Sequence, residues 1–484
     1  MELKLVRSAA PAVDADALIL IGAEGQKRPD LAAPLALQYE SGEISGKPGE
    51  ATLVHNVVGF KARRILVAGS GKPEKFDTAK LRKLVSTAVR TLSGKGIKTA
   101  ALALDAALAT PANVAAAAEA ALLGFWEPDR LKTGKEPEKR LESFTVAADS
   151  SDSALDAAFE KGRILGEAAN TTRDIAVEPP NRLTPLTLAD RARAVATAAG
   201  LEIEVLDQDR MTQLGMGALL GVAMGSAAPP ALIVIRYNPA SGPTKDHLGL
   251  VGKGVTFDTG GISIKPAEGM EKMKYDMAGG AAVIGAMQAI AQLKPSVSVT
   301  GIIPAVENMP GSKAQRPGDI VTSLSGKTIE VLNTDAEGRL ILVDAIAYAK
   351  QLGCTHLVDA ATLTGAIVVA LGHAASGVYS NDDTFLGAWM AASQTAGEQM
   401  WHMPLFEEYM DQLKCVYADI QNIGTRWGGA CTAAMFLKEF VGDTPWIHVD
   451  VAGTAWLDDA KPYLAKGPTG TPLGTFVNLA LNWT

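Results

Sequence analysis

Two short segments of this 484-residue chain carry acidic side chains whose spacing suggests chemistry. Asp258 lies in the glycine-rich segment 252–261, and Asp276 follows it, while Asp335 and Glu337 lie two residues apart directly after a strand-like run. In extended backbone, residues two apart share a side, so we expect the carboxylates of Asp335 and Glu337 to aim at one point. Converging carboxylates repel unless a cation lies between them or one of them is protonated. The two segments therefore predict a site for divalent ions.

Other kinds of site fit these segments less well. The glycine-rich segment lacks the GxxxxGK[ST] spacing of a phosphate-binding loop. Gly326-Lys327-Thr328 lacks it too, because Val321 occupies the position of the first glycine. The six histidines are scattered without an HExxH spacing. A dinuclear phosphoesterase would also use carboxylates, but such enzymes more often recruit histidine, and neither segment contains one. An oxygen-rich ligand set suits two hard or borderline divalent ions.

The first part of the chain alternates strand-like runs with alanine-rich helical stretches, which is typical of an α/β domain. The expected strands are 17–22, 64–69 and 99–104, and a packed helix is expected at 112–123. A further helical stretch, 153–170, leads to the proline-rich segment 178–181. We therefore expect two domains, 1–170 and 171–484.

The second part is also α/β, and its chemically informative residues lie at the ends of its strand-like runs. We expect these strands at 232–236, 248–251, 297–303, 328–332, 356–361 and 446–451. Ligands in open α/β sheets bind beyond the carboxyl ends of strands, so this placement indicates a site. A helix is expected at 340–352, before Gly353, and its free N–H groups beside Arg339 predict a small-anion site.

Composition restricts the classes of protein that the chain can belong to. Hydrophobic residues make up 47% and charged residues 20%, the balance of a globular protein. The net charge of −8 argues against nucleic acid as a general partner. Cys354, Cys415 and Cys431 lie far apart, so we expect buried thiols and no disulfide framework. No segment resembles a secretory signal or a membrane span, and we expect a cytoplasmic protein.

Three motifs in the second part resemble those of the leucyl aminopeptidase family of dinuclear metallopeptidases, which includes bacterial aminopeptidase A. Residues 333–340 reproduce the family octapeptide NTDAEGRL, and the likeness extends through 359–365 and 448–454 to cover essentially 170–484. The resemblance implies an enzyme that releases the N-terminal, leucine-like residue from peptides. It also implies a smaller macro-like N-terminal domain and a larger catalytic domain with a mixed sheet and helices on both faces.

The resemblance assigns roles to the residues of both segments. Lys253, Asp258, Asp276 and Glu337 match the ligands of the tighter ion, and Asp258, Asp335 and Glu337 match those of the more exchangeable one. The ions implied are manganese or zinc, with magnesium or cobalt as alternatives. Lys253 must be neutral to coordinate, which requires cations to lower its pKa. Lys265 matches the catalytic lysine that stabilises the oxyanion. Arg339 matches the residue that holds a bicarbonate ion, which moves a proton from water to the leaving amine.

The resemblance also implies a substrate pocket and an assembly. The positions matching the pocket for the first side chain are Met273, Thr362, Gly365 and Ala452, with backbone contacts from Leu363. Ordinary core packing is the alternative for Met273 and Ala452. The substrates implied are peptides with a free N-terminus, and the family is hexameric, with Trp401, Trp427 and Trp456 as candidates for subunit contacts. Relatives that bind DNA or serve as metal-free scaffolds are alternatives, and the complete set of polar site residues argues against a scaffold.

Overall fold

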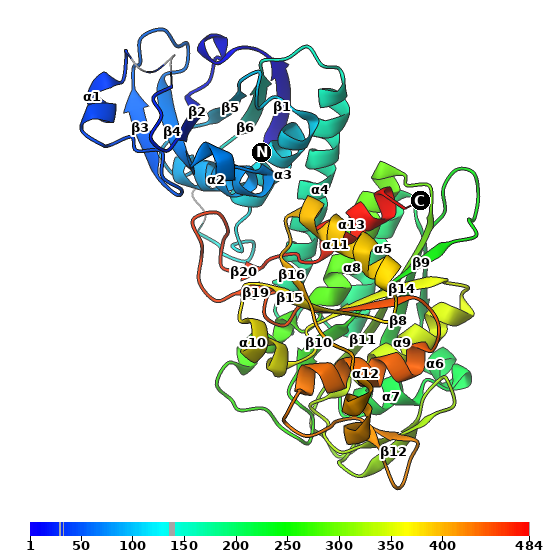
Figure 1. Cartoon of the computed structure of the whole chain (residues 1–484). Coiled ribbons are helices and arrows are strands. Elements are labelled where there is room, and N and C mark those ends of the chain that lie inside the picture. Colours follow the sequence, from blue (N-terminus) through cyan, green and yellow to red (C-terminus); the bar gives the residue numbers. More distant parts are fainter. Residues whose placement is uncertain (29–30, 32, 135–140, 484) are drawn as a thin grey trace. The chain divides into compact units, whose positions relative to one another are not determined.

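The computed structural model describes residues 1–28, 31, 33–134 and 141–483, which pack into two compact units (Figure 1). The first unit comprises Met1–Asn170 and Asp458–Gly467, and the second comprises Thr171–Leu457 and Pro468–Thr484. Helix α4 (Ala154–Ala176) includes residue 170, so no loop marks the domain division that we predicted there. The described residues contain no helix with both the length and the apolar character needed to cross a membrane.

The first unit contains a sheet with the strand order β1-β6-β5-β2-β4-β3, in which only β3 pairs antiparallel among the described residues. Its apolar strands have hydrophobic clusters on both sides, one of which includes residues of α2 and α3. The elements are β1 (Glu2–Arg7), β2 (Ala17–Ala23), α1 (Ala36–Glu40), β3 (Ala51–His55), β4 (Arg64–Gly71), α2 (Thr78–Leu92), β5 (Thr99–Leu104), α3 (Pro111–Phe125) and β6 (Ser143–Ala148). The predicted α/β architecture is confirmed.

The second unit is organised around a mixed sheet with the strand order β16-β15-β18-β14-β9-β11-β8-β7, and β10 also pairs with β11. Strands β9, β10, β11, β14 and β18 run parallel, so their carboxyl ends meet at one edge. The strands are β7 (Glu202–Leu206), β8 (Ala231–Tyr237), β9 (His247–Gly252), β10 (Gly254–Asp258), β11 (Ser298–Asn308), β14 (His356–Ala361), β15 (Ser376–Ser380), β16 (Met400–His402) and β18 (Trp446–Asp450).

Helices cover both faces of this sheet, as predicted (Figure 1). One face carries α5 (Pro185–Ala199), α8 (Ala278–Leu293), α11 (Asp383–Ala396) and α13 (Leu473–Leu481), and the other carries α6 (Gln208–Leu214), α7 (Gly217–Ala223), α9 (Glu337–Gln351) and α12 (Gly429–Val441). Beside them lie α10 (Gly365–Leu371), the 3-10 helices η4 (Met270–Tyr275) and η5 (Glu407–Leu413), and a small sheet of β12 (Asp319–Thr322), β13 (Thr328–Val331) and β17 (Ile420–Gln421).

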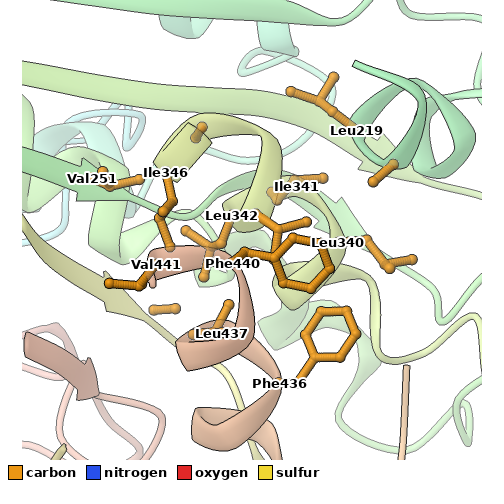
Figure 2. Packing of buried hydrophobic residues seen from close by; sticks show 14 of the residues in the cluster. Leu219, Val251, Leu340, Ile341, Leu342, Ile346, Phe436, Leu437, Phe440 and Val441 are labelled. Atoms are coloured by element: carbon orange, nitrogen blue, oxygen red, sulfur yellow. The ribbon is translucent and has the colours of Figure 1, made fainter. Parts of the chain in front are cut away.

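Helix α9 is buried on all sides, which is typical of a helix inside a large core. Figure 2 shows its packing against α7, β9 and α12, through Leu340, Ile341, Leu342 and Ile346 on α9 and Leu219, Val251, Phe436, Leu437, Phe440 and Val441 around it. Asp344 is fully buried in the same helix and accepts hydrogen bonds from the backbone N–H groups of Leu219 and Leu324. The first turn of α9 is therefore held by a well-packed core.

Two expectations about local structure were wrong. We predicted that the helix begins at Leu340, but α9 begins at Glu337, so Asp335 and Glu337 do not share an extended strand. Ala336 precedes the helix without a side-chain cap, so the usual N-terminal signal is missing. We also predicted that Cys415 is buried, but it is half-buried and its thiol donates a hydrogen bond to Glu330.

Candidate metal centre

The acidic residues singled out in the sequence lie together at the carboxyl edge of the mixed sheet. Lys253 lies between β9 and β10, and Asp258 is the last residue of β10. Asp276 directly follows η4, and Glu337 is the first residue of α9. Side-chain oxygens of Asp258, Asp335 and Glu337 all lie within 4.8 Å of one another. The carboxylates converge as predicted, although the turn and helix that carry Asp335 and Glu337 differ from the extended backbone that we expected.

Two lysines neutralise part of this negative charge from opposite sides. The Lys253 Nζ lies 2.7 Å from Asp276 Oδ2, 2.8 Å from Glu337 Oε1 and 2.9 Å from the Thr362 carbonyl oxygen. The Lys265 Nζ lies 2.8 Å from Asp258 Oδ2 and 2.5 Å from Asp335 Oδ1. The Lys253 side chain is 3% exposed and that of Lys265 is 22% exposed. Lys253 therefore lies at the closed side of the centre and Lys265 at its open side.

The pKa directions follow from burial and from the crowding of like charges. Burial raises the pKa of the Asp258 carboxyl, and the neighbouring Glu337 carboxylate raises it further. Burial also raises the pKa of Asp276 well above its usual range. Burial lowers the pKa of Lys253, but Asp276 and Glu337 outweigh this effect and raise it overall. These carboxylates are costly to keep charged without added positive charge, which fits a site for cations.

Hydrogen bonds fix the orientation of the buried carboxylates. Asp258 Oδ1 accepts from the Asn308 side-chain amide and from the Gly260 N–H, both at 2.8 Å. Asp276 Oδ1 accepts from the Thr362 hydroxyl at 2.7 Å. The second oxygen of each carboxylate contacts a lysine amine, Asp258 Oδ2 that of Lys265 and Asp276 Oδ2 that of Lys253. Asn308 was not predicted, because the strand that we expected at 297–303 extends to Asn308.

Two glycines allow the close approach of these groups. Gly260 has φ +85°, and a Cβ there would lie 2.7 Å from Asp335 Oδ1. Gly338 lies in the first turn of α9, where a Cβ would lie 2.8 Å from Lys253 Cε. Real Cβ atoms essentially never come within 3.0 Å of another heavy atom in this way. A larger residue at either position would therefore displace a side chain of the centre, that of Asp335 in the case of Gly260 and that of Lys253 in the case of Gly338.

Arg339 lies in the first turn of α9 with its guanidinium buried. Its Nη1 donates to the Asn422 carbonyl oxygen at 2.8 Å, and its Nε has no hydrogen-bond partner in the part of the chain that the structure describes. Burial lowers the pKa of Arg339 to about 10, although Glu337 and Asp450 raise it in part. A buried donor without a partner is costly. The guanidinium is therefore suited to a small anion.

The residues expected to line a substrate pocket are brought near the centre by Asp450, the last residue of β18. Asp450 accepts hydrogen bonds from the Leu363 N–H at 3.1 Å, the Thr364 hydroxyl at 2.7 Å and the Ala452 N–H at 3.2 Å. Thr362 bonds Asp276, and the Met273 carbonyl accepts from the Asp276 N–H. Met273, Leu363 and Ala452 are half-buried, and Gly365 is exposed. Asp450 was not predicted as a site residue, although it lies inside the motif 448–454.

Comparisons with known proteins identify the family. The family model described as the cytosol aminopeptidase family, catalytic domain, matches residues 170–477, and the model of the N-terminal domain of the same family matches residues 20–135. The chain belongs to the cytosol aminopeptidase family. It is 58% identical over the full length of both chains to a probable cytosol aminopeptidase of Solibacter usitatus. It is 47% identical to one of Koribacter versatilis, covering 96% of this chain and 97% of the relative.

Solved structures agree with the family assignment. A mutant of tomato leucine aminopeptidase superposes with a TM-score of 0.89 at 32% identity, covering 99% of this chain and 96% of that one. The bottromycin maturation enzyme BotP in complex with Mn superposes with a TM-score of 0.87 at 33% identity, covering 96% and 99%. This member of the cytosol aminopeptidase family is therefore a metallo-exopeptidase that binds divalent metal and cleaves peptides at the N-terminus, as the motifs predicted.

Proposed function

We propose that the centre holds two divalent ions and hydrolyses the first peptide bond of substrates with a free, leucine-like N-terminal residue. Lys253, Asp258, Asp276 and Glu337 would bind the tighter ion, and Asp258, Asp335 and Glu337 the more exchangeable one. The observation that supports this assignment is the convergence of three carboxylates within 4.8 Å. Manganese or zinc is the expected pair, with magnesium or cobalt as alternatives. Bound ions of this kind lower the pKa of a shared water and polarise the scissile carbonyl.

The two lysines have different tasks in this proposal because their exposure differs. Lys253 is enclosed and contacts three acceptors, so it is suited to act as a ligand once its proton is lost. Lys265 lies at the open side, where substrate arrives, and carries the ammonium that would donate to the oxyanion of the tetrahedral intermediate. The surrounding carboxylates, Asp258 most strongly and then Glu337, outweigh the effect of burial and raise the pKa of Lys265, which keeps this ammonium charged.

Arg339 provides the remaining polar function. Its guanidinium is buried, and its Nε lacks a partner among the described residues, which favours a small planar anion such as bicarbonate beside the first turn of α9. An anion held there by Arg339 would supply a proton acceptor and donor between the water and the leaving amine, a task for which the two acidic segments contain no histidine. Leu363, with Met273, Thr362, Gly365 and Ala452, would form the pocket for the first side chain.

The expected setting of this activity is a cytoplasmic homohexamer that turns over peptides. Trp401 and Trp427 are exposed, which suits subunit contacts, whereas the Trp456 ring stacks on Tyr275 at 5.1 Å within the same unit. The division into domains 1–170 and 171–484 stays a prediction. A secondary role in DNA binding has no support from the net charge of −8, and a salt-dependent gel shift tests it.

Hydrolysis of a leucine anilide with added Mn²⁺ tests the proposed function. We expect activity that a chelator abolishes, and a loss of several orders of magnitude in Lys265→Ala. Lys327→Ala is the matched control, because Lys327 also pairs with a carboxylate, that of Glu439, away from the centre. A rate that persists in the presence of chelator, or equal rates for the two variants, would refute the assignment.

A further inference from the structure

Asn422 is a fully buried residue outside the three motifs, and it contacts the segment that carries Asp335. It directly follows β17, which pairs in parallel with β13. Its Oδ1 accepts hydrogen bonds from the backbone N–H groups of Leu332 at 2.8 Å and Asn333 at 3.3 Å. Its Nδ2 donates to the Asn333 carbonyl oxygen at 2.7 Å. The side chain therefore holds the backbone where the chain leaves β13.

The backbone of Asn422 also contacts the other end of this segment. Its carbonyl oxygen accepts from Arg339 Nη1 at 2.8 Å. Between these two anchor points lie Asp335 and Glu337. The Asp335 N–H donates to the side-chain oxygen of Asn333 at 2.8 Å, so the position of Asp335 depends on Asn333. One buried residue thus connects the base of the Asp335 turn with the guanidinium of Arg339.

We propose that Asn422 is a positioning residue for the reaction, which holds Asp335 at the more exchangeable ion and Arg339 at the anion. This inference rests on the proposed ligand assignment. Residues 332–336 belong to no helix or strand, so hydrogen bonds must supply the order that regular structure supplies elsewhere. Groups that orient metal ligands typically change metal affinity about 10- to 100-fold when removed.

The effect of Asn422→Ala should differ between the two ions. Asp335 is assigned to the more exchangeable ion alone, whereas Lys253 and Asp276 bind the other ion and have no hydrogen bond to Asn422 among the described residues. We expect the dissociation constant for the second Mn²⁺ to rise about 10- to 100-fold, with that for the first changed less than about threefold. At saturating Mn²⁺, kcat should still fall more than KM rises, because the Asn422 carbonyl oxygen that accepts from Arg339 Nη1 is no longer fixed by the side-chain hydrogen bonds of Asn422.

Asn381 offers a control for the general cost of losing a side-chain amide that bonds the backbone on both sides, although it is half-buried whereas Asn422 is buried. Its Oδ1 accepts from the Trp446 N–H at 2.8 Å, and its Nδ2 donates to the Thr444 carbonyl at 2.9 Å and the Gly442 carbonyl at 3.3 Å. It lies at the amino end of β18, opposite the edge that carries the centre. Asn381→Ala should lower thermal stability as Asn422→Ala does, and it should leave Mn²⁺ binding and kcat unchanged.

Titration of the metal-free full-length protein with Mn²⁺, followed by calorimetry and by the rate on a leucine anilide, makes the comparison. If Asn422→Ala does not fold, Asn422→Asp and Asn381→Asp replace the pair, since aspartate keeps the acceptor and removes the donor. Equal Mn²⁺ affinities in the two variants would overturn the positioning role. Failure of the wild-type protein to bind two ions would instead overturn the proposed ligand assignment.

Discussion

Replacement of Gly338 by alanine should damage the centre without damaging the fold. Gly338 lies in the first turn of α9, and an added Cβ would lie 2.8 Å from Lys253 Cε and 3.0 Å from its Nζ, whereas ordinary contacts begin at 3.4 Å. The end of the Lys253 side chain must therefore move by about 0.6 Å. It cannot do so freely, because Asp276, Glu337 and the Thr362 carbonyl hold its amine at 2.7 to 2.9 Å.

The size of the loss follows from this displacement. A misplacement of about 1 Å in a catalytic constellation costs roughly 100-fold in rate, so a shift of about 0.6 Å should lower kcat/KM about 10- to 100-fold. This corresponds to about 1.4 to 2.7 kcal/mol of transition-state stabilisation. Alanine is at the same time the better helix former, by up to about 1 kcal/mol. Activity should therefore fall while the free energy of unfolding changes little.

Gly387→Ala provides the control, because Gly387 lies inside helix α11 and an added Cβ there meets no atom within 4 Å. This variant should gain stability and keep its activity. The assay is kcat/KM on a leucine anilide at saturating Mn²⁺, together with the metal content after dialysis and the unfolding midpoint. Wild-type kcat/KM and metal content in Gly338→Ala would show that Lys253 does not need its observed position.

Two further predictions concern stability and substrate choice. Burial raises the pKa of Asp344 to about 7 from 3.8, so the unfolded chain binds fewer protons between these pH values and stability falls as the pH rises from about 4 to 7. Asp344→Asn should remove this pH dependence, which amounts to about 4 kcal/mol of unfolding free energy in total. Denaturant unfolding across that pH range measures it, and an unchanged pH slope in the variant would contradict the prediction. A leucine anilide with an acetylated N-terminus should be cleaved at least about 100-fold more slowly than one with a free amine. The reason is that an amide nitrogen offers no usable lone pair to a metal. Equal rates for the two substrates would contradict recognition of the N-terminus by the centre.

The sequence predicted which side chains come together where a single segment contains both the side chain and its support. Asp258 ends a strand, and Lys253 lies between two strands, so hydrophobic runs alone place both at the carboxyl edge of the sheet. The motif 333–340 is likewise one continuous segment. Within such segments, residue type and spacing determine which side chains meet.

Residues that support the centre from a distance were not predicted. Asn422 bonds a segment that lies 83 to 90 residues earlier in the chain, and Asn308 bonds Asp258 across 50 residues. Asparagine in a loop or at a strand end is common, and no local pattern indicates which backbone it will contact. Only the pairing of β17 with β13 and of β10 with β11 brings these amides to the carboxylate segments.

The structural difference between the ligands gives a physical reason for unequal binding of two ions. Glu337 begins a helix that is packed on all sides, and Asp258 ends β10, which pairs with β11, and bonds Asn308 and Gly260, so these carboxylates are held in place and buried. Asp335 is half-buried in a turn whose order depends on the Asn333 and Asn422 hydrogen bonds. An ion that needs Asp335 must therefore be held by the more exposed and less constrained ligand. An ion held by Lys253 and Asp276, as we propose, would have buried partners, so it should exchange more slowly.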